Sequence, residues 1–219
     1  MPPPATVLFD LDGTLVDAFT TIHRAYQHTL PLFGVAAPTA AEVRRAVGGG
    51  LENAMGRFLP PESIEEACRI HVAYTETILL EDPVPYDGAA ALLSALHARG
   101  VRTGVLTNKI GDHARAVLAH LGLSADLDLV LGARDCPWRK PAPEFTAEAL
   151  RRIGGAAADC CLVGDSPFDI ETARRAGFPC YAVTTGTHDA AALGTAGAAG
   201  VFPGLRALAR AAFGLDLAG

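Results

Sequence analysis

Several protein classes are excluded by what this sequence lacks. None of its five cysteines forms a C-x-x-C pair, the spacing typical of zinc knuckles and dithiol redox sites. Lysine and arginine total 18 against 24 aspartate and glutamate residues, and the net charge of −6 argues against a nucleic-acid or anionic-membrane binder. No run approaches the ~18 apolar residues of a membrane span, and no basic region precedes the first apolar run as a secretory signal requires. We therefore expect a cytoplasmic protein with no nucleic-acid or membrane partner.

The sequence does contain a regular alternation of short apolar runs and helical patterns. Its 219 residues, 50% hydrophobic and 19% charged, suffice for one sizeable core with a smaller insert. Apolar runs that predict buried strands lie at residues 7–9, 101–106, 127–131, 160–163, 180–183 and 199–202. Helical patterns lie between them at residues 88–99, 112–121, 143–153 and 169–176. The alternation predicts an α/β fold with a Rossmann-like, doubly wound parallel sheet.

One long stretch, residues 17–83, breaks this alternation. It has no convincing strand pattern, and helical patterns lie at residues 20–30, 40–47, 51–59 and 62–80. The segment Pro83-Val84-Pro85 closes the stretch in the manner of a linker. We therefore expect a core domain made of residues 1–16 and 84–219, and a small all-helical domain of residues 17–83 inserted after the first strand.

Acidic residues follow two of the predicted strands. Asp10 and Asp12 follow the strand at residues 7–9, and Asp165 and Asp169 follow the strand at residues 160–163. Ligands of parallel sheets gather at the carboxyl ends of the strands, so up to four carboxylates converge if these two strands are neighbours. Carboxylate oxygens suit a hard cation such as Mg²⁺, which would offset their repulsion. Taken alone, each motif also fits a simpler interpretation, a solvated turn for the first and a helix cap for the second.

Two further polar motifs offer groups that can bind a phosphoryl oxygen. Thr107 and Asn108 provide a hydroxyl and an amide where the strand at residues 101–106 ends. Lys140 lies in a proline-framed loop and offers a positive charge. Each of these residues, taken singly, is equally consistent with an ordinary polar turn or a solvated lysine.

In chain order the motifs are Asp-x-Asp-Gly-Thr, Thr-Asn, Lys-Pro and Gly-Asp-Ser-x-x-Asp. This pattern resembles the haloacid dehalogenase superfamily of phosphohydrolases, and the resemblance covers essentially the whole chain. The helical stretch after the first motif is similar to the C1-type cap of that superfamily. Residues 105–109 and 47–52 look most like the phosphoglycolate phosphatase branch.

The resemblance implies a role for each motif in hydrolysing a small phosphorylated metabolite. Asp10 would be the nucleophile that becomes an aspartyl phosphate, and Asp12 would protonate the leaving oxygen and then activate water. Mg²⁺ would be held by the Asp10 carboxylate, the Asp12 backbone carbonyl and Asp165, with Asp169 in support. The residues that would hold the phosphoryl oxygens are Thr107, Asn108 and Lys140.

A candidate for substrate recognition lies in the helical stretch, at Gly48, Gly49 and Gly50. Glycines let a backbone approach a ligand closely, and a helix start after them would present free N–H groups to an anion. Arg45, with Arg44 before it, adds positive charge. A second anion site here would suit a substrate with a carboxylate at its far end, such as phosphoglycolate. The alternative is that the glycines form only a turn.

Three other functions share parts of this pattern. A β-phosphoglucomutase-like mutase has the same motifs and cap, but it must grip a second phosphate, and no Ser-Arg pair occurs near residues 48–52. A dehalogenase uses one aspartate and no metal, which Asp12 and the pair Asp165 and Asp169 argue against. A non-enzymatic phosphoacceptor domain is about half this long and has no cap. No feature of the sequence indicates an oligomeric state.

Overall fold

The computed structural model describes residues 3–217. Its centre is a six-stranded sheet in the order β5-β4-β1-β6-β7-β8, with every neighbouring pair parallel. The strands are β1 Thr6–Phe9, β4 Arg102–Ile110, β5 Leu129–Ala133, β6 Cys160–Gly164, β7 Cys180–Val183 and β8 Gly200–Phe202. The predicted doubly wound parallel sheet is confirmed, and each of the six predicted strands is present. The main difference is β4, which continues to Ile110 instead of ending at residue 106.

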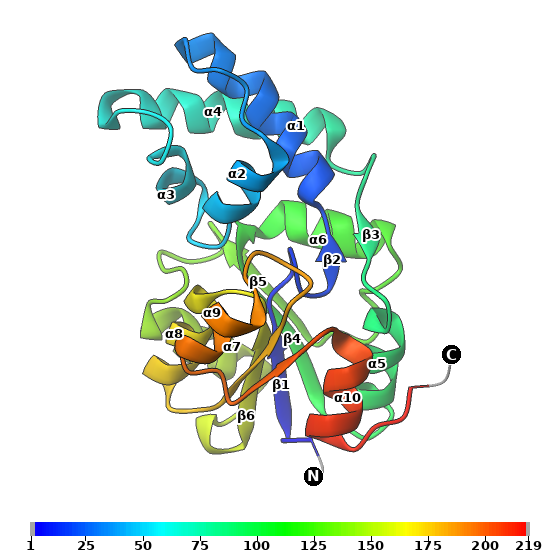
Figure 1. Cartoon of the computed structure of the whole chain (residues 1–219). Helices are drawn as coiled ribbons and strands as arrows, with labels where there is room; N and C mark the ends of the chain where they lie inside the picture. Colours follow the sequence, from blue (N-terminus) through cyan, green and yellow to red (C-terminus); the bar gives the residue numbers. More distant parts are fainter. Residues whose placement is uncertain (1–2, 218–219) are drawn as a thin grey trace.

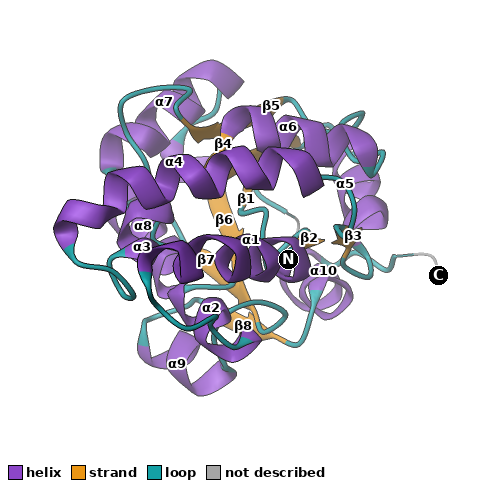
Figure 2. Cartoon of the chain, turned by 90° about the horizontal axis from the view of Figure 1, so that it is seen from above, coloured by secondary structure: helices purple, strands orange, loops and turns teal. Residues whose placement is uncertain are grey.

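Helices cover both faces of the sheet (Figure 2). One face packs against α5 Ala89–His97, α6 Gly111–His120 and α10 Leu205–Phe213. The other packs against α7 Pro143–Ile153, α8 Pro167–Ala176 and α9 Ala190–Thr195. Neither α9 nor α10 was predicted from the sequence, although the apolar spacing over residues 205–213 was a readable signal. No helix within residues 3–217 is long and apolar enough to cross a membrane.

The sequence of β1 is apolar without alternation because this strand lies at the centre of a sheet that is covered on both faces. Val7 and Phe9 pack in the core on the α5, α6 and α10 side, whereas Leu8 packs in the core on the opposite side. Successive side chains of a strand point to opposite faces, and both faces of this sheet are covered by helices. All residues of β1 are therefore buried.

The helical insert, residues 17–83, lies above the carboxyl ends of the strands (Figure 1). It contains α1 Phe19–Thr29, η1 Leu30–Phe33, α2 Ala40–Ala46, α3 Leu51–Met55 and α4 Pro61–Ile78. A core of its own, which includes Tyr26, Leu30 and Met55, holds these helices together. The chain enters and leaves the insert through β2 Val16–Asp17 and β3 Val84–Pro85, which pair antiparallel. The segment at residues 83–85, expected as a linker, is thus partly a short strand.

The strand order creates the place where a site can form. From β1 the chain proceeds to β4 and β5 on one side, and it then returns to β6, β7 and β8 on the other. Such a reversal leaves a crevice at the carboxyl ends of the central strands. The polar residues that follow β1, and those at the irregular end of β4, line this crevice under the insert, and Asp165 after β6 lies against Asp10.

Candidate active site

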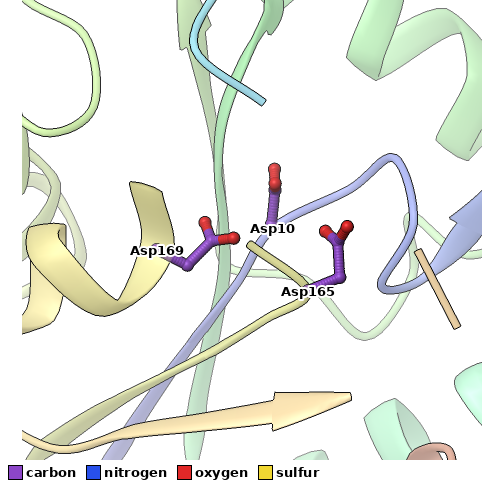
Figure 3. Close-up of side chains that lie close together, drawn as sticks. All are labelled: Asp10, Asp165 and Asp169. Atoms are coloured by element: carbon purple, nitrogen blue, oxygen red, sulfur yellow. The ribbon is translucent and has the colours of Figure 1, made fainter. Parts of the chain in front are cut away.

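Three aspartates meet at the carboxyl ends of β1 and β6 (Figure 3). Asp10 directly follows β1, Asp165 directly follows β6, and Asp169 lies in the first turn of α8. One carboxylate oxygen of each lies within 4.8 Å of the others, and all three residues are buried. We call these three residues the carboxylate cluster. Because Asp10 is buried, it does not lie in a solvated turn, the simpler interpretation of its motif.

Local hydrogen bonds hold two members of the cluster. The Asp165 carboxylate accepts bonds from Thr187 N at 2.8 Å, Thr187 Oγ1 at 2.9 Å and Thr14 Oγ1 at 3.3 Å. Asp169 Oδ2 accepts bonds from Ser166 N at 3.1 Å and Ser166 Oγ at 2.6 Å. The residue that caps α8 is therefore Ser166 rather than Asp165. Asp165 is thus not used as a helix cap, and its carboxylate lies beside those of Asp10 and Asp169.

Lys140 supplies the positive charge beside the cluster. Its side chain is only 1% exposed, and its Nζ lies 2.9 Å from Asp10 Oδ2 and 2.6 Å from Asp169 Oδ1. Burial disfavours the ammonium ion, but the attraction of Asp10 and Asp169 outweighs it and raises the pKa of Lys140 above its ordinary value. Lys140 therefore remains protonated between the two carboxylates.

One lysine does not balance three carboxylates. Burial outweighs the attraction of Lys140 and, with repulsion from Asp169, raises the pKa of Asp10 from 3.8 to about 6. Burial, together with repulsion from Asp169 and Asp10, raises the pKa of Asp165 to about 8. Three buried oxygen donors with an excess of negative charge fit a hard divalent cation such as Mg²⁺.

Asp12 is near the cluster but not part of it. Both of its carboxylate oxygens lie 3.1 Å from Lys109 Nζ, and its side chain is 12% exposed. Three of the four expected carboxylates therefore converge, and the fourth pairs with a lysine. The Asp12 carboxylate borders the crevice, where it can reach a bound molecule.

The Thr-Asn motif lies where the register of β4 shifts. Thr107 is buried, and its Oγ1 accepts a hydrogen bond from Lys109 N at 3.2 Å. Asn108 bonds to both sides of the crevice: its Oδ1 accepts from Lys140 N at 2.9 Å, and its Nδ2 donates to Gly48 O at 2.9 Å. In this structure Asn108 therefore joins the Lys140 loop to the helical insert.

A cavity of about 130 Å³ lies between the carboxylate cluster and the insert. Asp10, Asp12 and Asn108 line its core side. The wall contributed by residues 17–83 is apolar apart from a few neutral polar side chains, and no lysine or arginine of the described insert lines it. The insert residues on this wall that carry polar side-chain atoms are Thr21, Tyr26, His71 and Thr75.

The glycine run meets this cavity only in part. Gly48 and Gly50 line it, whereas Gly49 is buried against the side chains of Asn53 and Phe168. Arg45 is exposed and does not line the cavity. Arg44 also points elsewhere, with its guanidinium 4.0 Å from the centre of a phenylalanine ring in α1. The charge expected beside the glycines is therefore absent from the cavity wall.

Three residues that hold the site together were not predicted from the sequence. Lys109 pairs with Asp12, and its only sequence signal was its place directly after Thr107 and Asn108. Thr187 donates a hydrogen bond to Asp165. The polar run Thr-Thr-Gly-Thr after β7 could have indicated a site residue there. Gly13 has φ of 90°, and a Cβ there would lie 2.7 Å from Asp165 Cγ, so the turn after Asp12 requires glycine.

Comparisons with known proteins identify the family of this chain. The haloacid dehalogenase-like hydrolase family matches residues 7–183. A phosphoglycolate phosphatase of Rhodospirillum rubrum is 37% identical over 194 residues, covering 84% of this chain and 80% of the relative. A phosphoglycolate phosphatase of Aquifex aeolicus is 32% identical over 175 residues, covering 78% of this chain and 80% of the relative.

A solved structure gives the same result for the fold. A haloacid dehalogenase-like family protein from Streptococcus pneumoniae superposes with a TM-score of 0.81 at 27% identity, covering 90% of this chain and 92% of the other. The family match spans both halves of the sheet and the insert between them. The chain therefore belongs to the haloacid dehalogenase-like hydrolase family, in its phosphoglycolate phosphatase-like branch, and is a phosphoric monoester hydrolase.

Proposed function

We propose that this protein is a Mg²⁺-dependent phosphatase that hydrolyses a small phosphorylated metabolite, phosphoglycolate or a close analogue, through an aspartyl phosphate. The observation that carries the proposal is the buried carboxylate cluster with Lys140 beside it, directly beneath a small cavity. Phosphoryl transfer depends on in-line positioning and on neutralised charge, and this arrangement suits both.

The residues that would hold the metal are the carboxylates of Asp10 and Asp165 and the backbone carbonyl of Asp12, with Asp169 in support. The raised pKa values of Asp10 and Asp165 fit this role, because burial and, next, repulsion from Asp169 disfavour their charged forms, and a bound cation would offset both effects. When bound, Mg²⁺ would neutralise the charge of the phosphoryl group. Thr187 and Thr14 orient Asp165 for such a ligand role.

The chemical step uses Asp10 and Asp12 in turn. An Asp10 carboxylate oxygen attacks phosphorus, so an O–P bond forms as the bond to the leaving oxygen breaks. Asp12 gives its proton to that leaving oxygen. In the second half, Asp12 takes a proton from water as the water oxygen attacks phosphorus, the Asp10 O–P bond breaks, and inorganic phosphate leaves. Lys109, 3.1 Å from both oxygens of Asp12, keeps that carboxyl directed into the cavity.

The phosphoryl oxygens would be held by Thr107, Asn108 and Lys140. Lys140 is buried beside Asp10, so its charge stays close to the reacting phosphorus. Asn108 fixes the backbone of Lys140 by two hydrogen bonds, at 2.9 Å and 3.2 Å. The two hydrogens of its amide are donated to the carbonyl oxygens of Gly48 and Lys140 in this structure, so Asn108 would act on the phosphate through the position of Lys140, and directly once the insert moves and Gly48 releases it.

The size of the cavity supports a small substrate. Its volume of about 130 Å³ is well below the roughly 300–1,000 Å³ of pockets for drug-sized ligands. The curated relatives described above are phosphoglycolate phosphatases, and phosphoglycolate is among the smallest phosphate monoesters. A sugar-phosphate mutase needs a cation in its cap for a second phosphate, and among the described residues of the insert none lines this cavity.

We also propose that residues 1–16 and 84–219 form a core domain and residues 17–83 a cap domain that closes over it. Residues 1–2 and 218–219 of that division lie outside the described part of the chain. Contacts that join the two parts include Asn108 with Gly48, Arg139 with Glu52, and Arg44 with the Gly186 carbonyl. Closure excludes water during the attack by Asp10, and opening at the paired β2 and β3 releases the product.

The direct test is phosphate release from a panel of phosphorylated metabolites by the wild type and by Asp10→Asn. The wild type should hydrolyse 2-phosphoglycolate in the presence of Mg²⁺, and removal of Mg²⁺ with a chelator should abolish this activity. Asp10→Asn should lose several orders of magnitude in turnover, because the amide is a poor nucleophile and a weak metal ligand. The matched control is Asp159→Asn, an exposed position away from the cavity. An Asp10→Asn variant with a tenth of wild-type activity would rule out the covalent mechanism.

A further inference from the structure

Two buried polar atoms on the insert wall of the cavity have no partner. Thr21 on α1 and His71 on α4 both line the cavity and are 2% and 7% exposed. Thr21 Oγ1 and His71 Nδ1 accept or donate no hydrogen bond within the described residues. An unpartnered buried polar group is costly and rare in folded proteins. Side chains that line a binding cavity can receive their missing partner from a ligand.

The Thr21 hydroxyl is not bonded to the backbone of its own helix. Thr29, on the same helix, donates its hydroxyl hydrogen to the Ala25 carbonyl oxygen at 2.8 Å, one turn before it. Thr21 makes no such bond, and its hydroxyl remains free beside the cavity. Valine at this position would have nearly the same shape without the hydroxyl, so packing alone does not account for threonine.

His71 is held in place but left free at one nitrogen. Its ring packs edge-on against Tyr26, with ring centres 4.7 Å apart. Burial, with a smaller contribution from the charge of Lys109, lowers the pKa of His71 to about 4, so the ring is neutral near pH 7. A neutral imidazole has one N–H and one acceptor nitrogen. The backbone of Ala25 favours a hydrogen on the ring nitrogen that faces it. With the hydrogen on that nitrogen, the unpartnered Nδ1 is the acceptor.

We propose that Thr21 and His71 form a subsite for a hydroxyl group at the far end of the substrate. We call this pair the α1–α4 subsite. A ligand hydroxyl can donate its hydrogen to His71 Nδ1 and accept one from the Thr21 hydroxyl, which satisfies both unpartnered atoms. A carboxylate has no hydrogen to give to Nδ1. The absence of lysine and arginine from this wall, within the described insert, also favours a neutral group.

The subsite adds a substrate class to the proposed activity. It lies on the insert wall of the cavity and Asp10 on the core wall, so a short phosphate monoester held by its phosphoryl group meets the subsite with its other end. The inference rests on the proposed phosphatase function. It predicts that small hydroxylated phosphate monoesters are hydrolysed beside phosphoglycolate.

The test compares 2-hydroxyethyl phosphate with propyl phosphate, which has a methyl group in place of the hydroxyl. Wild-type kcat/KM should be at least about fivefold higher for the hydroxylated ester. Propyl phosphate lacks the hydroxyl and therefore leaves the Thr21 hydroxyl and His71 Nδ1 unpaired. Thr21→Val should lower kcat/KM for 2-hydroxyethyl phosphate by roughly fivefold and change that for propyl phosphate by less than about twofold. Thr21→Ser keeps the hydroxyl and should restore the preference. His71→Phe keeps the ring packing and should lose the preference as Thr21→Val does.

Thr146→Val is the matched control. Thr146 is likewise buried with an unpartnered hydroxyl, but it lies on α7 in the core and does not line the cavity. Its replacement should leave the ratio of the two kcat/KM values unchanged. Equal losses on both esters in Thr21→Val and His71→Phe would overturn the subsite while leaving the phosphatase function intact. A wild type that releases no phosphate from either ester, from 2-phosphoglycolate or from p-nitrophenyl phosphate would overturn the proposed function and the subsite with it.

Discussion

Replacing Asp165 with asparagine should stabilise the metal-free protein. The pKa of this carboxyl is about 8 in the folded chain against 3.8 ordinarily, chiefly because it is buried and next because Asp169 and Asp10 repel its charge. The folded state therefore binds the proton more tightly than the unfolded state. For this reason the free energy of unfolding falls as pH rises from about 4 to about 8. Asparagine is neutral at every pH and escapes this loss.

At pH 7 the loss is a large part of the stability of an ordinary domain. One pKa unit corresponds to about 1.4 kcal/mol, so the buried carboxyl costs on the order of 4 kcal/mol at that pH. The asparagine oxygen can still accept the bonds from Thr187, and its NH₂ group can donate to the Thr14 hydroxyl. We therefore expect a net gain of about 2–4 kcal/mol, or roughly 5–10 °C in Tm for a chain of this length.

The assay is thermal unfolding of the wild type and Asp165→Asn in a chelator, followed from pH 4 to pH 8.5. The difference in Tm should be near zero at pH 4 and grow up to about pH 8. Added Mg²⁺ should raise the Tm of the wild type and have little effect on the variant, because binding to the folded state stabilises it by mass action. Asp159→Asn should show neither change. A variant no more stable than the wild type at any pH would refute the reasoning.

Three further predictions concern the same site. Asp12→Asn should slow turnover by about 10²–10⁴-fold. In single-turnover experiments, the rate of phosphorylation by p-nitrophenyl phosphate should fall less than the rate with an alkyl phosphate, because its leaving group needs less protonation. Equal losses of rate would contradict the proton-donor role. Lys140→Met should lower the free energy of unfolding at pH 8 by about 3–5 kcal/mol, because two buried carboxylates lose their cation. Measured by urea denaturation, this loss of unfolding free energy should be smaller at pH 5, because Asp10, with a pKa of about 6, is then mostly neutral. A loss of the same size at both pH values would reject the charge argument. X-ray scattering with and without a phosphate mimic should show two positions of residues 17–83, and one invariant position would count against closure.

The sequence was most informative where one local pattern has one structural solution. The apolar runs at residues 7–9 and 160–163 can be satisfied only by burial on both faces, and both became central strands. Carboxylates placed just after such strands lie at a shared edge once the sheet is parallel. Asp10, Asp165 and Asp169 could therefore be grouped from the order of strands and acidic residues along the chain.

The sequence was less informative where a pattern is short or ambiguous. The strands β2 and β3 have two residues each and become stable only by pairing with one another across the whole length of the insert. Helix α9 is a six-residue segment of alanine, leucine, glycine and threonine with one buried residue, which gives little periodicity to read. In both cases tertiary contacts, and not local preference, decide the conformation.

By itself, the sequence determined the doubly wound sheet, the helical insert and the residue types gathered at the carboxyl ends of the strands, because hydrophobic periodicity and motif order are local properties of the chain. Only the tertiary structure decided which side chains face the cavity. Arg45 stands three residues before Gly48 and yet lies outside the cavity, whereas Thr21 and His71, fifty residues apart, line it together. The rotation of each helix of the insert about its axis selects its cavity-facing side chains, and that rotation is set by packing in the insert core around Tyr26, Leu30 and Met55.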